Sequence, residues 1–468
     1  MDSEAMAKPE ISLLSLPDDA LLAVLAFLPT RDLFVCRVAC RRLRDLCLHR
    51  HLWRAATVES KGVLRAALAV APCIGTIGEV PIEALEPLVA TACTVSELKL
   101  LVVGKESAAL ASALLSRFST VSSGLRLKKL SLEVRGPLTR TSRRLLKQVC
   151  SFTGLQDLSI DLKGELPERE WSKLNVQPSL SKLSYTSSSR DAFLQLLLST
   201  HSATLENVDL QFREYFELPW RSLASLSRLR SLRCFQDDGL SKLAALPNLN
   251  SVELEANDQW YDGFDPGAVE FLSKAPHLRM VKLGAVSHDT APLLALANSP
   301  SAPHLEKLHI YPWFQDLDDE SNVFDTLASV LQEFVSLNSL IAVIDELPYD
   351  LLQVISPISS PKLTVLVLAD VTGEKFKCLH ETLHDPFVQD LLVGNPQLHL
   401  RLKAHDEDMD LKSCKSCSWC RRSCHVRLRR DVRVALSSHC RRGGCPVDCY
   451  QAFQPSDRTY SESNPDLS

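Results

Sequence analysis

The sequence predicts an α/β protein in three parts: a short all-α domain, a long strand–helix solenoid shaped like a horseshoe, and a small cysteine-rich tail. Apolar residues recur at helical spacing in the first fifty-odd residues, and a short leucine pattern returns through the middle of the chain. Seven of the fifteen cysteines fall between Cys414 and Cys449. At 468 residues the chain is too long for one compact core, which favours several domains or a repeat array.

Composition favours a folded protein in a reducing compartment. Hydrophobic residues make up 45% and charged residues 23%, and the net charge of -5 selects no partner class. Asp18 and Asp19 interrupt the N-terminal apolar stretch, and no later run approaches the roughly 20 apolar residues that cross a bilayer. We therefore expect no membrane association, a cytoplasmic and/or nuclear location, and cysteines that are thiols or metal ligands.

The N-terminal segment has the pattern of short amphipathic helices. A helix is predicted to begin at Pro17, since proline suits the first turn and the two aspartates that follow suit the positive end of the helix dipole. Leu21, Leu25 and Leu28 then recur at helical spacing, and Pro29 ends the helix before a second one begins.

The motifs of this segment resemble an F-box. The resemblance runs from about Ile11 to Val58 and contains, in order, Leu16-Pro17-Asp18-Asp19, Leu28-Pro29, Val38-x-Cys40-Arg41 and Leu52-Trp53. Cys36 stands where the family often has an apolar residue. Leu43 lies next to the position where many members carry tryptophan, so the docking face is expected to be less aromatic.

The resemblance implies docking to a Skp-family adaptor, which bridges to a cullin scaffold and a RING subunit. The residues implied to dock are Leu16, Pro17, Leu21, Leu25, Leu28, Pro29, Leu33, Val38 and Trp53. Some of them must instead pack the F-box itself, and the sequence does not divide the two groups. Seven arginines between Arg31 and Arg54 oppose only two aspartates, which fits an acidic partner and a solvated helical face equally well.

The middle of the chain repeats a leucine pattern: an apolar residue, two others, an apolar residue, one other and an apolar residue. The clear cases begin at Val95, Leu127, Leu155, Leu180, Leu205, Leu229, Leu249, Leu278, Leu305 and Leu363, and weaker ones lie at Leu337 and around Leu398. Their spacing lies within or just beyond the roughly 20–29 residues of leucine-rich repeats. An ordinary α/β domain also has apolar strands, but it would not repeat one pattern in this way, so a solenoid with concave strands and convex helices is predicted.

The F-box and the repeats together resemble the leucine-rich-repeat class of F-box proteins, which implies that the repeats hold a target protein. Candidate contacts beside the strand leucines are Lys99, Glu133, Asp161, Asp209, Arg233, Glu253, Lys282 and His309. Two insertions add the candidate substrate-binding residues Trp260, Tyr261, Trp313 and Phe314. Aromatic loops are enriched at binding surfaces, although the rings could equally fold back over the edge of the solenoid.

The cysteine-rich tail has metal-ligand spacing. Its candidate ligands are Cys414, Cys417, Cys420, Cys424, Cys440, Cys445 and Cys449. Such density in an intracellular chain favours structural zinc, with no specific metal and a ferredoxin-type iron–sulfur cluster as the alternatives. A second zinc would need His425 or His439, and ten Lys and Arg between Lys412 and Arg442 leave nucleic-acid contact open.

The predicted organisation is a non-catalytic adaptor. We expect an F-box over residues 10–58, a helical linker or N-terminal cap over 59–94, the solenoid over 95–404, the basic tail over 405–455 and a disordered C-terminus over 456–468. The sequence contains no P-loop, dinucleotide-type glycine cluster or hydrolase motif. The predicted function is substrate recognition in a Skp–cullin–F-box ubiquitin ligase. The alternative is a metal-stabilised nucleic-acid- or protein-binding scaffold that acts through the basic tail.

Overall fold

The structure is a computed structural model with two compact units, Met1–Leu229 and Arg230–Ser468. It describes residues 13–78, 80–91, 93–120, 126–164, 171, 177–188, 192–212, 218–255, 263–284, 289–311, 323–344, 347–370, 382, 385–404 and 436–438.

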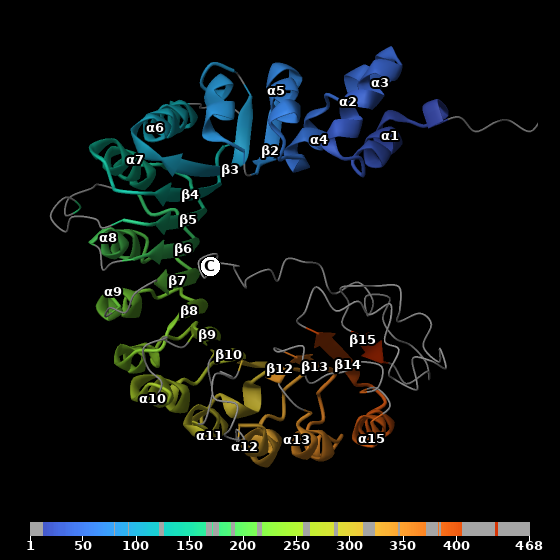
Figure 1. The fold of residues 1–468 in the computed structure, drawn as a ribbon, viewed down its shortest axis with the longest axis vertical. Coiled ribbons are helices and arrows are strands. Elements are labelled where there is room, and N and C mark those ends of the chain that lie inside the picture. The colour runs from blue at the N-terminus through green and yellow to red at the C-terminus, as the bar shows by residue number, and fades with distance from the viewer. Residues whose placement is uncertain are drawn as a thin grey trace, which may run out of the picture. The chain divides into compact units, whose positions relative to one another are not determined.

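The N-terminal unit begins with short helices that enclose a small core. The helices are η1 (Leu13–Ser15), α1 (Asp18–Leu25), α2 (Thr30–Ala39), α3 (Arg41–Leu46) and α4 (Arg50–Ala55) (Figure 1). Trp53 is 1% exposed, donates from its indole Nε1 to the carbonyl of Cys47 at 2.8 Å, and contacts the ring of Phe34 edge-on. Because both ends of the indole are satisfied, this tryptophan holds the helices together.

The same unit continues directly into a parallel array of strands. Its elements are β1 (Thr57–Val58), α5 (Lys61–Val70), β2 (Cys73–Ile77), η2 (Ile82–Val89), β3 (Thr94–Val103), α6 (Gly104–Thr120), β4 (Lys129–Arg135), α7 (Arg140–Cys150), β5 (Asp157–Leu162), β6 (Lys182–Ser187), α8 (Ala192–Thr200), β7 (Asn207–Phe212) and α9 (Trp220–Ala224). Strands β1 to β7 pair in parallel, each with the next in sequence.

The repeat array begins earlier than the leucine pattern indicates. The segment 59–94, expected to be a helical linker or cap, contains α5 and η2 but also strand β2, which pairs with β3. The pattern does not reveal β2 because Gly75 occupies its centre. A Cβ at Gly75 would lie 2.4 Å from the carbonyl oxygen of Arg54, so the close packing of α4 on this strand requires glycine.

The register of the strands reproduces the leucine pattern. Leu130, Leu158, Leu183 and Val208 stand opposite one another in β4 to β7, and all are buried. The alternate residues of each strand point to the other side, which we call the strand face. The helices of this unit lie along one side of its strands (Figure 1).

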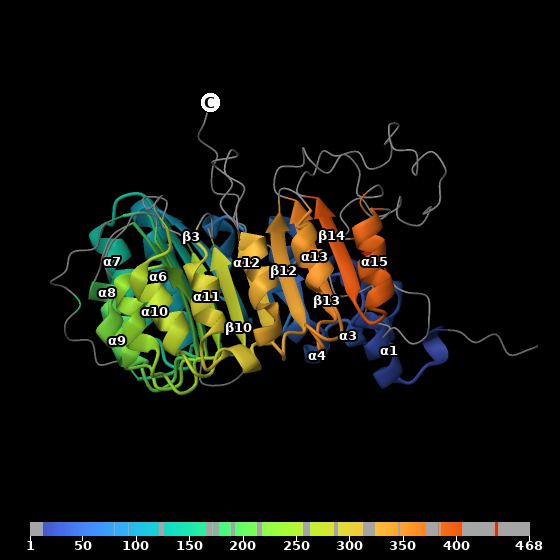
Figure 2. The same ribbon diagram turned by 90° about the horizontal axis from the view of Figure 1, so that it is seen from below.

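The C-terminal unit repeats this arrangement. Its elements are β8 (Ser231–Phe235), η4 (Asp238–Leu243), β9 (Ser251–Glu255), α10 (Pro266–Lys274), β10 (Met280–Gly284), α11 (Ala291–Ala297), η5 (Ala302–His304), β11 (Lys307–Tyr311), α12 (Val323–Val330), η6 (Leu331–Glu333), β12 (Ser339–Ile344), α13 (Tyr349–Val354), β13 (Val365–Asp370), α15 (Pro386–Gly394), β14 (His399–Ala404) and β15 (Leu436–Ser438). Figure 2 shows the helices of this unit along one side of its strands.

Both weak cases of the leucine pattern form strands. Leu340 of β12 pairs with Leu308 on one side and Leu366 on the other, and Leu400 of β14 pairs with Leu366. The predicted fold class, an all-α N-terminal segment followed by a solenoid-like array of parallel strands and helices, is confirmed. Strand β15 adds an unexpected element, because it pairs antiparallel with β14.

One side-chain device recurs in the turns between repeats. His201 lies four residues before the pattern that begins at Leu205, and its Nδ1 accepts from the backbone N–H groups of Ser179 and Leu180 at 3.1 and 3.4 Å. Ser301 lies four residues before Leu305. Its Oγ accepts from the N–H of Leu278 at 2.9 Å. Both side chains therefore satisfy backbone groups at the start of the preceding repeat.

Candidate functional site

The residues predicted to dock an adaptor fall into two groups. Leu21, Leu25, Leu33 and Trp53 are at most 4% exposed and form the interior of the N-terminal helices. Leu16 and Leu28 are part-buried, Pro17 and Pro29 are exposed, and Val38 is 79% exposed. The buried group therefore holds the domain together, and only the second group can meet a partner without unfolding it.

The same helices expose further apolar side chains that the sequence did not single out for docking. Phe27 is 89% exposed after α1, and Val35 of α2 is 62% exposed. Val24, Leu13 and Leu14 are also exposed. We call Leu13, Leu14, Val24, Phe27, Val35 and Val38 the apolar surface of the N-terminal helices. Helical spacing from Val38, which was predicted to dock, could have identified Val35 three residues before it.

An arginine anchors the N-terminal end of this surface. Arg42 of α3 donates to the carboxylate of Asp18 at 2.9 Å and to the carbonyls of Leu14 and Leu16 at 2.5 and 2.7 Å. These bonds fix the short helix η1, which carries Leu13 and Leu14, to the helices that carry the rest of the surface.

A family model supports the prediction that the N-terminal segment is an F-box. The F-box-like family matches residues 13–58, which contain the helices η1 to α4 and the whole apolar surface. Residues 13–58 are an F-box-like domain.

The other comparisons add less. No curated protein matches the chain. One similar solved structure is that of a Bacteroides fragilis protein, which is 12% identical over 66% of this chain and 74% of its own length, with a TM-score of 0.34. That similarity is too low to support a functional assignment.

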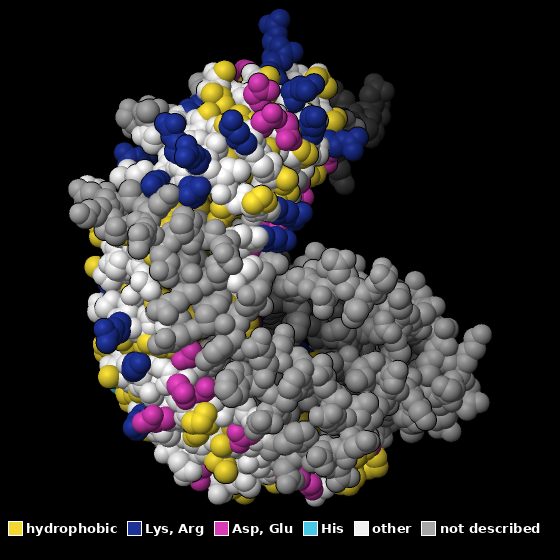
Figure 3. Space-filling view, turned by 60° about the vertical axis from the view of Figure 1, so that its left-hand side comes forward, with side chains coloured by type: hydrophobic (Ala, Val, Ile, Leu, Met, Phe, Trp, Pro, Cys, Tyr) yellow, Lys and Arg dark blue, Asp and Glu magenta, His cyan; other side chains and the backbone are white. Residues whose placement is uncertain are grey.

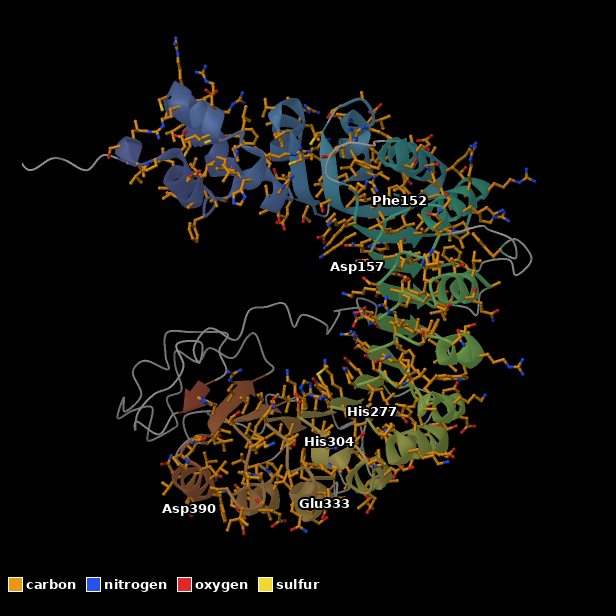
Figure 4. All side chains as sticks on the ribbon, turned by 180° about the vertical axis from the view of Figure 1, so that it is seen from behind. Phe152, Asp157, His277, His304, Glu333 and Asp390 are labelled. Atoms are coloured by element: carbon orange, nitrogen blue, oxygen red, sulfur yellow. The ribbon has the colours of Figure 1, made fainter. Side chains whose placement is uncertain are left out.

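The strand face of the N-terminal unit is polar and carries paired charges. Glu133 of β4 contacts Arg135 at 2.7 Å and Lys163 at 3.6 Å. Burial opposes ionisation of Glu133, but the hydrogen bond from Arg135 and the two positive charges outweigh it and lower the pKa of its carboxyl group. Asp157, labelled on the strand side in Figure 4, lies 3.9 Å from Lys182.

The strand face of the C-terminal unit changes in character along the array. In β8 to β10, Arg233 pairs with Glu253 and Glu255, and Lys282 lies 3.0 Å from Glu253. Beyond them stands His309 of β11. Burial, with the nearby charges of Lys282 and Lys307, lowers its pKa to about 3, so the imidazole is neutral at physiological pH. Figure 4 shows that Glu333 and Asp390 lie on the opposite, helical side of this unit.

The helical side of the N-terminal unit carries positive charge. Figure 3 shows Lys and Arg side chains over this surface, and Arg140 and Arg144 of α7 are exposed there. A charged helical face is common in soluble proteins, and we assign it no binding role.

The remaining site predictions lie outside the described residues. These are the aromatic residues Trp260, Tyr261, Trp313 and Phe314 and the tail cysteines Cys414, Cys417, Cys420, Cys424, Cys440, Cys445 and Cys449. Within the described part of the chain, no group of three or more His, Cys, Asp and Glu residues could hold a metal ion. No helix of that part is long and apolar enough to cross a membrane.

The cysteines of the described segments are free thiols. Cys47, Cys73, Cys93, Cys150 and Cys234 are buried. Burial raises the pKa of the Cys47 and Cys93 thiols to about 11 and that of the Cys150 thiol to about 12. Protonated thiols are poor nucleophiles, so Cys47, Cys93 and Cys150 pack as small apolar side chains.

Proposed function

We propose that the chain is the substrate-recognition subunit of a Skp–cullin–F-box ubiquitin ligase. The observation that carries the proposal is the apolar surface of the F-box-like domain, where Phe27 and Val38 are 89% and 79% exposed. In a domain this small, exposed apolar side chains of this kind mark the surface that a partner covers to complete the core. The occupant is a Skp-family adaptor, which connects the chain to a cullin and a RING subunit.

The energetics favour binding through a few side chains. Burying one Val or Phe contributes about 1.5–3 kcal/mol, so several together offset the entropic cost of association. The buried residues Leu21, Leu25 and Leu33 contribute indirectly, because they hold the helices in the geometry that presents the apolar surface.

In this role the chain is a non-catalytic adaptor. The repeat arrays hold a protein target while other subunits transfer ubiquitin, in the cytoplasm, the nucleus or both. The function requires no cofactor. A structural zinc in the tail is a separate proposal, supported by cysteine spacing alone, and metal analysis of the purified full chain tests it.

Co-purification tests the adaptor role. We expect the Skp-family adaptor and the cullin to copurify with the tagged full-length chain, and Phe27→Asp or Val38→Asp to reduce recovery at least about tenfold by placing a charge in the apolar contact. Ile358→Asp is the matched control, because Ile358 is 94% exposed and lies outside the F-box-like domain.

The chosen positions separate a lost contact from a lost fold. Phe27 and Val38 are exposed, so the circular dichroism spectrum and melting temperature of the variants should match the wild type. Undiminished recovery with both aspartate variants, or a failure of the wild type to bring down the adaptor, would refute the proposal.

A further inference from the structure

The strand register of the C-terminal unit aligns a row of side chains on the strand face. Lys282, His309, Ile341, Val367 and Arg401 stand opposite one another on β10 to β14. With neighbouring strands about 4.8 Å apart, the row spans about 19 Å. It has positive charge at both ends and aliphatic side chains between them.

The aliphatic part extends along both central strands. Ile341 and Val343 of β12 and Val365, Val367 and Ala369 of β13 occupy strand-face positions. We call these five residues the apolar strip. They do not belong to the leucine core, because the core residues of the same strands alternate with them. Val367 is 3% exposed and the other four are part-buried.

The surroundings of the strip are positive. Lys307 is exposed on β11, the strand next to β12, and Lys282 stands one strand further away on β10, where it lies 3.0 Å from Glu253. At the strand-face positions of β10 to β14 within the described residues there is no Asp or Glu. On β9, Glu253 contacts both Arg233 and Lys282, and Glu255 contacts Arg233.

A polar group with no partner lies at the border of the strip. The Nδ1 atom of His309 is buried and has no hydrogen-bond partner among the described residues. Its ring lies 6.4 Å from that of Tyr311. Lys282 stands opposite His309 on β10 and Lys307 lies two residues before it on β11, so an anionic group over this ring would lie near two positive charges.

We propose that this strand face binds a protein segment in which an anionic side chain stands next to aliphatic side chains. The aliphatic side chains would lie on the apolar strip and the anionic group beside Lys307 and His309. Burial of the aliphatic side chains favours binding, and the negative charge sets the direction of the segment. That the bound segment belongs to a ubiquitination target rests on the proposed function, whereas the binding itself does not.

The arrangement fits a protein better than a nucleic acid. Single-stranded nucleic acids are held by a continuous basic groove with rings on which bases stack. Here two adjacent strands with aliphatic side chains separate Lys307 from Arg401. A phosphate backbone crossing the row would lie over a surface that cannot neutralise it.

Peptide selection tests the proposal. The full-length chain would be panned against a phage-displayed library of random short peptides, and we expect enrichment of Asp or Glu next to Ile, Leu, Val or Met. For the best synthetic peptide, Ile341→Asp should raise the Kd at least about tenfold, and Lys307→Glu should raise it about three- to tenfold. Lys307 is exposed, so this second variant keeps the fold.

Three controls make the outcome decisive. Ser159→Asp places the same new charge on the strand face of the N-terminal unit and should leave the Kd unchanged. Phe27→Asp should also leave it unchanged, so a failure of the ligase role and a failure of this proposal can be told apart. Versions of the peptide with Glu, phosphoserine or Gln at the anionic position compare the two sources of negative charge with a neutral group.

Several results would overturn the proposal. The first is a library selection that enriches no acidic–aliphatic sequence, and the second is peptide binding that Ile341→Asp does not change. The third is equal affinity for the peptides with glutamate and with glutamine. The fourth is binding of labelled polyuridylate that is tighter than binding of the best peptide and that Lys307→Glu abolishes. A p-benzoylphenylalanine at position 341 that crosslinks within its own chain would show that the face is already occupied, and would overturn it too.

Discussion

The two units build their strand faces on the same backbone pattern, but part of the C-terminal face is apolar where the N-terminal face is polar. On β4 to β6 of the N-terminal unit, one row consists of Ser131, Ser159 and Ser184. On β11 to β13 of the C-terminal unit, the corresponding row is His309, Ile341 and Val367. The leucines behind both rows are equally buried, so the fold leaves the strand-face positions free to vary.

The difference teaches where specificity is placed in a repeat protein. In the N-terminal unit, ion pairs such as Lys129–Glu97 at 3.6 Å are largely exposed and stabilise the fold by well under about 1 kcal/mol. Such a face is soluble without a partner. The aliphatic side chains of the apolar strip in the C-terminal unit form no ion pairs, and in our proposal they contact a bound protein segment.

The largest expected effect tests whether the buried leucine layers of the two units are equally well packed. Leu183→Ala and Leu340→Ala remove side chains that are fully buried in the two units, and each should lower the free energy of unfolding by about 2–5 kcal/mol. Urea denaturation followed by far-UV circular dichroism measures both. A cost below about 1 kcal/mol in either unit would show that its leucine layer is not a packed core.

The next effect tests the hydrogen bonds that His201 and Ser301 accept from backbone N–H groups of the preceding repeat. His201→Ala and Ser301→Ala each leave buried backbone N–H groups without an acceptor, which should cost about 1–3 kcal/mol. Ser199→Ala is the control, because Ser199 is exposed. Equal stability of all three variants would mean that water replaces the lost bonds.

Acid should destabilise the folded chain through two of its histidines. Burial lowers the pKa of His201 to about 4, and burial with nearby lysines lowers that of His309 to about 3, whereas an unfolded histidine has a pKa of 6.5. The unfolded chain therefore binds more protons below pH 6.5, and stability falls as the pH drops.

Urea midpoints across this range measure the histidine contribution. Between about pH 6.5 and 5 most carboxyl groups stay ionised, so the change reports mainly on histidines. The double variant His201→Gln/His309→Gln should flatten the dependence in this window. An unchanged slope would assign the proton uptake to other groups.

The smallest effect sharpens the comparison of the strand faces. Ser184→Ala should change the free energy of unfolding by less than about 0.5 kcal/mol, and Ile341→Ala by about 1 kcal/mol or less, because neither side chain belongs to the leucine core. A cost for Ile341→Ala as large as that for Leu340→Ala would show that the apolar strip is a second core of the chain rather than a binding surface.

The sequence predicted the repeat array because one physical requirement recurs in every repeat. Leu366 and Leu368 are buried on the same side of β13 as their counterparts on every neighbouring strand. The pattern at Leu337 was weaker only because Ala342 fills its third position, yet Ala342 is fully buried in the expected register.

The features that could not be predicted depend on contacts between distant segments. Strand β2 depends on the approach of α4 to Gly75, and β15 is a three-residue strand recruited by β14. The residues predicted to dock could be listed but not divided, since Leu25 and Val38 are both apolar and only the packing of the helices decides which one faces water. Phe27, which is also exposed, was not predicted.

The junction between the F-box-like domain and the first repeats has a mechanical consequence. Only Ala56 separates α4 from β1, and Thr76 and Gly78 donate backbone hydrogen bonds to Ala56 and Val58 at 3.0 Å. A flexible linker would let the F-box-like domain sample many orientations relative to the first repeats, whereas this short, hydrogen-bonded junction is stiff. In the proposed ligase, the first repeats would therefore keep one orientation relative to the bound adaptor, set by the fold and not by a diffusing linker.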